Sequence, residues 1–155
     1  MSAALVDLEG LKFSWGAKET LIDLPRWQVQ AGEQLLISGP SGCGKSTLLA
    51  LIAGIMVAPK GSVKLLGVDL ASLTAAHRDR FRADHIGIVF QQFNLIPYLS
   101  ALDNMVLACR LSSRRSQSFS TVNSMRDAAR KLANDLDLDA KAIARPVTQL
   151  SIGQQ

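Results

Sequence analysis

The run GPSGCGKSTLL at residues 39–49 places glycines, a lysine and hydroxyl side chains between two apolar segments. The phosphate-binding spacing G-x-x-x-x-G-K-[ST] is met by Gly39, Gly44, Lys45 and Ser46. Glycine loses more conformational freedom on ordering than any other residue, so a glycine cluster needs a tight turn or a bound group to justify it. We therefore predict that this run binds a polyphosphate.

The residue types in this loop each suit a contact with a nucleotide. Successive backbone N–H groups can converge on a phosphate, and the dipole of the following helix adds to the attraction. Lys45 is predicted to reach the β- and γ-phosphates, the Ser46 hydroxyl to ligate Mg²⁺, and Thr47 to add a donor. The residues predicted to surround the phosphates are Gly39, Pro40, Ser41, Gly42, Cys43, Gly44, Lys45, Ser46 and Thr47.

A phosphate loop must lie between a strand and a helix, and its flanks predict both. Residues 34–38 resemble a buried strand, and residues 45–55 an apolar helix. Further strands are predicted at 4–15, 24–30, 62–67 and 85–90, and helices from Thr74 to about 83, near 101–110 and near 124–136, with a polar linker at 112–121. Strands alternating with helices indicate an α/β layer fold.

Composition narrows the class of protein. The chain has 155 residues, 48% of them hydrophobic and 5% aromatic, which favours aliphatic layers around a core. Its longest apolar run, 48–58, is too short to cross a bilayer, and no secretory signal is visible. Cys43 and Cys109 lack metal-like spacing, which suits a reducing cytosol. The net charge of +4 does not require a nucleic acid, and we expect none because no aromatics interleave with the arginines.

Stretches in family order along the whole chain resemble the ATP-binding cassette (ABC) family. GPSGCGKSTLLALIAG resembles its phosphate loop and first helix, IGIVFQQFNLIPYLSALDNM (86–105) its Q-loop, and LSIGQQ (150–155) its signature LSGGQ. The run FQQFNLIP looks closest to the branch that serves lipoprotein release and macrolide export. The resemblance implies a P-loop NTPase fold. Residues 1–90 would form an N-terminal antiparallel β-subdomain with part of the P-loop core, and residues 91–155 the Q-loop, the α-helical subdomain and the signature.

The resemblance also assigns roles to residues outside the loop. Trp15 lies where the family places an aromatic that stacks on adenine, and Gln91 matches the glutamine that ligates Mg²⁺ and senses the γ-phosphate. Ser151 and Gly153 match the signature, which faces the γ-phosphate held by the other subunit. Ile152 departs from the usual glycine, and its β-branched side chain restricts the backbone there.

The implied function is that of the ATP-binding subunit of a membrane transporter, with ATP and Mg²⁺ bound at a head-to-tail homo- or heterodimer. Such a subunit is cytoplasmic, peripheral on the inner face of the membrane, and contacts a transmembrane permease through the segment FNLIPYLS at 93–100. Two alternatives remain: a soluble ABC ATPase with no membrane partner, and a truncated module that binds nucleotide without hydrolysing it.

Hydrolysis in this family needs residues that the sequence lacks. No apolar strand ends in Asp-Glu, and no switch histidine follows the signature. The resemblance therefore implies a cassette that is incomplete at its C-terminus. We expect a full-length parent to hydrolyse ATP and this chain alone to be inactive.

Overall fold

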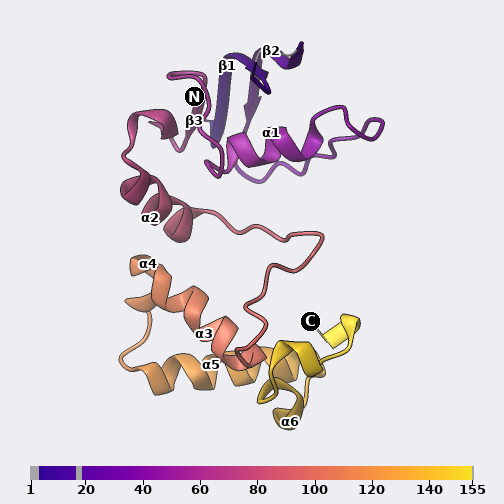
Figure 1. Ribbon diagram of the computed structural model, residues 1–155. Helices are drawn as coiled ribbons and strands as arrows, with labels where there is room; N and C mark the ends of the chain where they lie inside the picture. The colour runs from indigo at the N-terminus through magenta and orange to yellow at the C-terminus, as the bar shows by residue number, and fades with distance from the viewer. Residues whose placement is uncertain (1–3, 17–18, 155) are drawn as a thin grey trace. The chain divides into compact units, whose positions relative to one another are not determined.

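The computed structural model describes residues 4–16 and 19–154, and its contacts form two compact units, Met1–Arg82 and Ala83–Gln155 (Figure 1). The division that the resemblance implies at residue 90 stays a prediction. Asp84 and the Ile86 carbonyl, at the start of the second unit, hydrogen-bond to other residues of that unit.

The first unit contains an antiparallel sheet in the order β2-β1-β3-β4. Its strands are β1 (Val6–Ser14), β2 (Thr20–Val29), β3 (Val63–Leu65) and β4 (Val68–Asp69). They confirm the strands predicted at 4–15, 24–30 and 62–67, although the last ends at Leu65 and a two-residue turn then leads to β4. Leu66 and Gly67 occupy that turn with φ of 51° and 78°, the left-handed values that tight hairpins need.

In β1 the alternation of buried and exposed side chains is interrupted, and this shapes the core beside the sheet. Leu8 and Leu11 are both fully buried although they lie three residues apart. Gly10 between them has a φ of 57°, a backbone conformation that glycine adopts without steric cost. This turn of the chain directs both leucines into the same apolar cluster, which also contains Ile22 and Val63.

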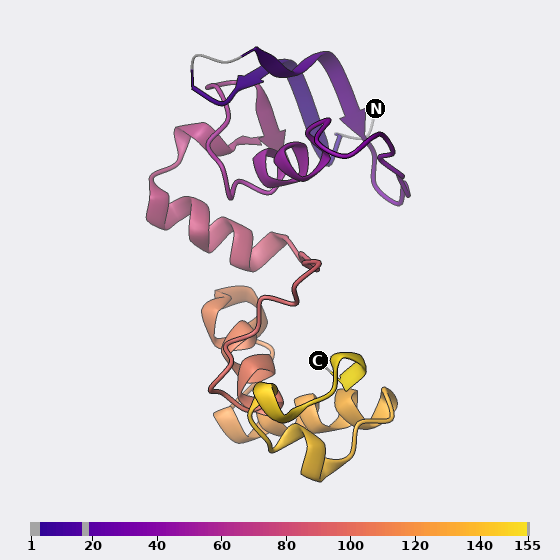
Figure 2. The same cartoon turned by 45° about the vertical axis from the view of Figure 1, so that its right-hand side comes forward.

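Helix α1 (Lys45–Ile52) lies against the sheet (Figure 2). Leu51 is buried in this contact, and Leu48 and Ile52 are partly buried beside it. The predicted helix at 45–55 is confirmed, but it ends earlier, at Ile52. A 3₁₀ turn, η1 (Leu70–Ser72), precedes α2 (Ala75–His85).

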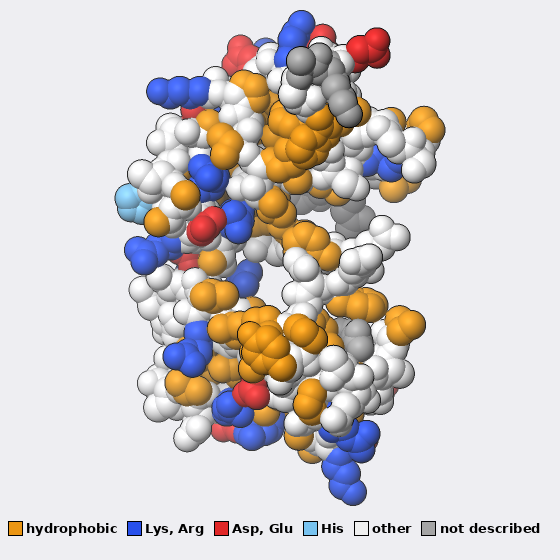
Figure 3. All heavy atoms as spheres, viewed as in Figure 1, with side chains coloured by type: hydrophobic (Ala, Val, Ile, Leu, Met, Phe, Trp, Pro, Cys, Tyr) orange, Lys and Arg blue, Asp and Glu red, His pale blue; other side chains and the backbone are white. Residues whose placement is uncertain are grey.

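Two predicted strands are wrong. Residues 34–38 and 85–90 form no strand, and Leu36 and Val89 are 91% and 97% exposed. An extended segment becomes a strand when its backbone groups pair with a neighbour, and in the described part of the chain neither segment has one. Apolar patches are exposed on both units (Figure 3).

The second unit is helical. It comprises α3 (Ala101–Leu111), α4 (Ser113–Ser116), α5 (Val122–Asp135), α6 (Ala140–Ile143) and the 3₁₀ turns η2 (Val147–Gln149) and η3 (Ile152–Gln154). Helices α3 and α5 lie side by side in Figures 1 and 2. Met125, Ala129 and Ala133 recur every four residues on α5 and are buried, as one face of a helix requires.

Local capping explains where these helices begin. The Ser100 hydroxyl accepts from the Asp103 N–H at the start of α3, and Thr121 forms a reciprocal capping box with Ser124 at the start of α5. The predicted helices near 101 and 124 are therefore confirmed. The predicted linker at 112–121 instead contains α4, because the Ser112 hydroxyl caps it through the Arg115 N–H. Among the described residues, no helix has the length and apolarity to cross a bilayer.

Candidate functional site

The loop at 39–44 reaches α1 through glycines that no larger residue can replace without strain. Gly44 caps the helix with a φ of 96°, and a Cβ on it would lie 3.1 Å from Leu21 Cγ. A Cβ on Gly39 would lie 2.9 Å from the Cys43 sulfur. The glycines therefore allow the loop to fold closely on itself and on β2.

The Lys45 side chain folds back across this loop. Its ammonium donates to the Gly39 and Pro40 carbonyls, at 2.7 and 2.8 Å, and to the Cys43 sulfur at 3.7 Å. These contacts hold a positive charge against the turn. A bound phosphate would offer the ammonium a negatively charged acceptor, which makes a stronger hydrogen bond than a carbonyl does.

A cavity of about 430 Å³ opens above the loop. Its lining residues are Trp15, Leu21, Ser41, Gly42, Gly44, Lys45, Ser46 and Thr47. Its volume falls within the range of small-molecule sites, about 300–1,000 Å³. The cavity joins an aromatic and an aliphatic side chain to an ammonium and several hydroxyls, which fits a ligand with an aromatic base and a phosphate tail.

Trp15 enters this cavity from the end of β1. It is 53% exposed, and the Phe13 ring packs edge-on against it with 5.3 Å between ring centroids. The edge contact supports the indole from the strand while its remaining surface stays accessible. Three of the predicted loop residues, Gly39, Pro40 and Cys43, contact Lys45 and are not among the lining residues.

The predicted site residue Gln91 belongs to the second unit and is exposed in a turn. Phe93 and Asn94 follow it with φ of 39° and 56°. Sequence analysis missed Asn104, whose side-chain amide accepts from the Ile96 N–H at 2.8 Å and donates to the Ile96 carbonyl at 3.1 Å. An asparagine one turn into a helix that follows an irregular loop could have indicated such an anchor.

The predicted signature residues Ser151 and Gly153 also belong to the second unit. The Ser151 N–H donates to the Gln154 side chain at 3.1 Å, and its carbonyl accepts from the Gln154 N–H at 2.9 Å. A 3₁₀ turn, η3, thus begins directly after Ser151, while the Ile152 side chain is 79% exposed.

A buried hydroxyl fixes the segment that precedes Gln91. Ser112 is fully buried, and its hydroxyl donates to the Asp84 carboxylate at 2.7 Å. The Arg114 N–H donates to the same carboxylate oxygen at 3.1 Å. These bonds, that from Ser112 first, lower the pKa of Asp84 because they stabilise the charged form. Sequence analysis missed this pair, since its members lie 28 residues apart.

A second carboxylate organises the start of α3. The Ser100 hydroxyl donates to Asp103 at 2.6 Å, and Arg126 of α5 lies 2.6 Å from the other carboxylate oxygen. The Ser100 bond lowers the pKa of Asp103, and the nearby Arg126 charge acts in the same direction. This cluster ties α5 to the helix that follows the loop at 91–100.

A family model described as ABC transporter matches residues 23–155. The uncharacterized ABC transporter ATP-binding protein YbbA of Escherichia coli is 36% identical over 154 residues, covering 97% of this chain and 64% of that protein. The uncharacterized ABC transporter ATP-binding protein Mb2593 of Mycobacterium bovis is 41% identical over 108 residues, covering 70% of this chain and 30% of that protein.

Solved structures agree with the sequence relatives. The ATP-binding cassette MJ0796, solved as a post-hydrolysis dimer bound to ADP and Pi, matches with a TM-score of 0.82 at 30% identity, over 96% of this chain and 64% of that chain. This chain thus spans only part of the length of the proteins it matches. It belongs to the ABC transporter family, as an ATP-binding cassette with the P-loop NTPase fold.

Proposed function

We propose that this chain binds MgATP as part of the ATPase subunit of an ABC transporter. The observation that carries the proposal is the cavity in which Trp15 meets the glycine loop and Lys45. ATP has an aromatic base and a phosphate tail, so a family that uses ATP for transport would need a site with both an aromatic surface and a phosphate-binding loop. The run FQQFNLIP, which resembles the branch that serves lipoprotein release and macrolide export, favours export over import and assigns no cargo.

The phosphates would be held by the loop and by the Lys45 ammonium. The Ser46 hydroxyl, which lines the cavity, is a proposed Mg²⁺ ligand. The family resemblance proposes the Gln91 amide as the other. Mg²⁺ is commonly held by few protein groups together with substrate phosphates and water, which fits a hydroxyl and an amide. Bound Mg²⁺ would neutralise charge that develops on the γ-phosphate during transfer to water.

The adenine would stack on Trp15. The accessible indole of Trp15 lines the same cavity as the loop, and the Phe13 ring packs edge-on against it. Stacking on an aromatic tolerates any base. Trp15 therefore contributes affinity, and we do not assign it selection of ATP over other nucleotides.

Turnover would require a second subunit. MJ0796 was solved as a dimer bound to ADP and Pi, which supports a dimer for this chain. The family resemblance leads us to propose that each nucleotide lies between the two chains. Ser151 and Gly153 of one chain are then proposed to contact the γ-phosphate held by the loop of the other. The partner is a second copy of this chain or a related cassette.

The proposed permease contact is the segment 93–100. Tyr98 is 79% exposed and Phe93 is 42% exposed, whereas Asn104 anchors the backbone at Ile96. Exposed aromatics on an anchored loop suit a protein interface. This contact would place the subunit at the cytoplasmic face of the membrane.

The test is thermal melting of the chain with and without MgATP, beside the variant Lys45→Ala. A ligand that binds the native state raises the melting temperature by mass action. We expect MgATP to raise the melting temperature of the parent and to leave that of Lys45→Ala unchanged. An equal shift in both proteins would show binding that does not use the loop. No shift in the parent would overturn nucleotide binding by this chain.

A further inference from the structure

The C-terminal end of α1 closes with a motif that satisfies its last carbonyls. The Ile55 N–H donates to the Ala50 carbonyl at 2.9 Å, and the Gly54 N–H to the Leu51 carbonyl at 3.1 Å. Gly54 has a φ of 65°. This bonding pattern with a left-handed glycine is the Schellman motif. It turns the chain sharply and leaves the Gly54 carbonyl available to another partner.

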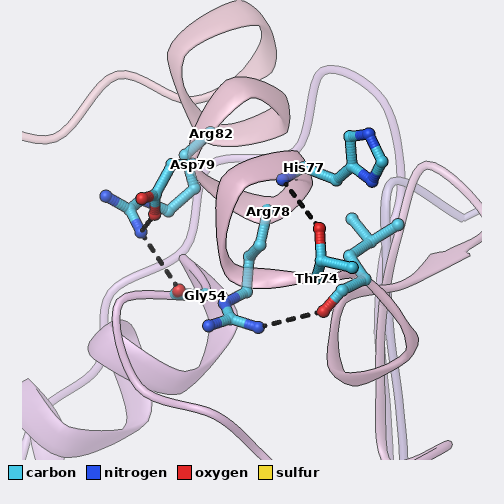
Figure 4. Close-up of polar contacts among 7 residues, drawn as sticks. Gly54, Thr74, His77, Arg78, Asp79 and Arg82 are labelled. Carbon is cyan, nitrogen blue, oxygen red and sulfur yellow. Dashed lines mark hydrogen bonds and ion pairs between the residues drawn. The ribbon is translucent and has the colours of Figure 1, made fainter.

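That partner comes from α2 (Figure 4). The Arg82 guanidinium donates to the Gly54 carbonyl at 3.3 Å, and the same nitrogen lies 2.7 Å from the Asp79 carboxylate. A Cβ on Gly54 would lie 3.4 Å from the Arg78 side chain and 3.0 Å from Leu70. The end of α1 is therefore in close contact with both η1 and α2.

The positive charge of Arg82 is favourable at the C-terminal end of α1. The C-terminal end of a helix carries partial negative charge, which a nearby cation stabilises. The Arg82 side chain is 31% exposed, so solvent screens this attraction less than at a fully open surface. Asp79, one turn earlier on α2, holds the guanidinium in place.

Leu51 is the fully buried residue of α1, and Leu48 and Ile52 are partly buried beside it. The N-terminal end of the helix rests on β2 through Gly44. The helix has 8 residues, or about 12 Å. Tilting so short a rod by about 10° about its centre moves each end by about 1 Å. A shift of that size at the phosphate loop is enough to weaken contacts with a ligand.

We propose that Arg82 is a positioning residue for the phosphate loop. It holds the C-terminal end of α1 through the Gly54 carbonyl, and the rigid helix transmits this restraint to Gly44 and Lys45 at its other end. The inference rests on the proposed nucleotide-binding function. It assigns Arg82 no contact with the nucleotide.

The test compares Arg82→Ala with Arg82→Lys and with Arg80→Ala. Arg80 is an exposed arginine on the same helix, so its removal matches the change in charge. ATP affinity is measured with a fluorescent ATP analogue well below the melting temperature of each variant, with Lys45→Ala as the reference for loop-dependent binding. Amide hydrogen exchange is followed separately in residues 39–52 and in β1.

We expect Arg82→Ala to weaken nucleotide binding about fivefold, the scale of one partly exposed charged hydrogen bond. Hydrogen exchange should accelerate at 39–52 and stay unchanged in β1, because the sheet does not depend on Arg82. Arg82→Lys should restore part of the affinity, and Arg80→Ala should match the parent.

Other results would overturn the proposal. If Arg82→Ala binds the ATP analogue as tightly as the parent does, while Lys45→Ala has lost binding, the proposal for Arg82 is wrong. The proposed nucleotide site would then still stand. Equal acceleration of exchange in β1 and in 39–52 would show a purely structural role. If Arg82→Ala does not fold, parent-like affinity and exchange in Arg82→Gln would decide against it. Failure of the parent to bind would instead count against the proposed function.

Discussion

Gly39 and Cys43 are packed so closely that a Cβ on the glycine would lie 2.9 Å from the Cys43 sulfur. That sulfur also accepts from the Lys45 ammonium at 3.7 Å. Glycine is therefore required at position 39 for two reasons: the close approach of the Cys43 sulfur, and the backbone conformation of the loop.

Gly39→Ala is expected to weaken ATP binding about tenfold or more, because displacing the cysteine and straining the backbone costs about 1–3 kcal/mol. Adding Cys43→Ala should recover part of the affinity, since it removes the sulfur that the new methyl group meets. Titration with a fluorescent ATP analogue measures both. Gly87→Ala is the control, because a Cβ there meets nothing within 4 Å. Parent-like affinity in Gly39→Ala would contradict the argument.

Trp15→Ala is expected to weaken nucleotide binding about tenfold, the scale of one base stacked on an aromatic ring. Trp15→Phe should retain most of the affinity. The melting temperature without nucleotide should change little, because the indole is 53% exposed. Fluorescence titration and thermal melting separate the two effects. Trp27→Phe, a change in the sheet on β2, serves as control, and a Trp15→Ala protein that binds as the parent does would remove the stacking role.

Ser112→Ala is expected to raise the pKa of Asp84 toward its ordinary value. The hydroxyl stabilises the carboxylate, so the folded-state pKa of Asp84 lies below the unfolded value of about 3.9. The stabilisation is therefore complete above about pH 4 and is lost as the pH falls through the folded-state pKa. Carboxyl NMR titration measures the shift, and melting at neutral and acidic pH should show the variant's deficit shrinking in acid.

Ser113→Ala is the matched control for this pair. Its side chain is exposed, and the change preserves the backbone beside Asp84. We expect the titration of Asp84 to stay as in the parent. An unchanged Asp84 titration in Ser112→Ala would show that the buried hydroxyl does not set the charge state.

The 155-residue chain is expected to release negligible phosphate from MgATP. It contains no Asp-Glu pair to position and polarise the attacking water. Phosphate release measured at saturating MgATP checks this. Steady release that disappears in Lys45→Ala would contradict the prediction and would show that other residues of the chain activate water.

Local sequence predicted the elements whose stabilising contacts are themselves local. Ser100 and Thr121 cap helices through N–H groups three residues away, so their residue types mark the starts of α3 and α5. The glycine loop was predictable for the same reason, because its geometry follows from which residues tolerate left-handed backbone. The family was predictable because its motifs are short and keep their order along the chain.

Residues far apart in the chain determined the rest. The segments 34–38 and 85–90 have apolar strand-like sequences, yet a strand exists by pairing, and the described chain supplies no neighbour. The contacts of Arg82 with Gly54 and of Asp84 with Ser112 each span 28 residues. Polar pairs of this kind produce no periodic pattern in the sequence. The partner of each side chain is known only once the fold has brought the two residues together. Sequence alone therefore determined the chemistry of the loop, and the packing of α2 against the end of α1 decided how that loop is held.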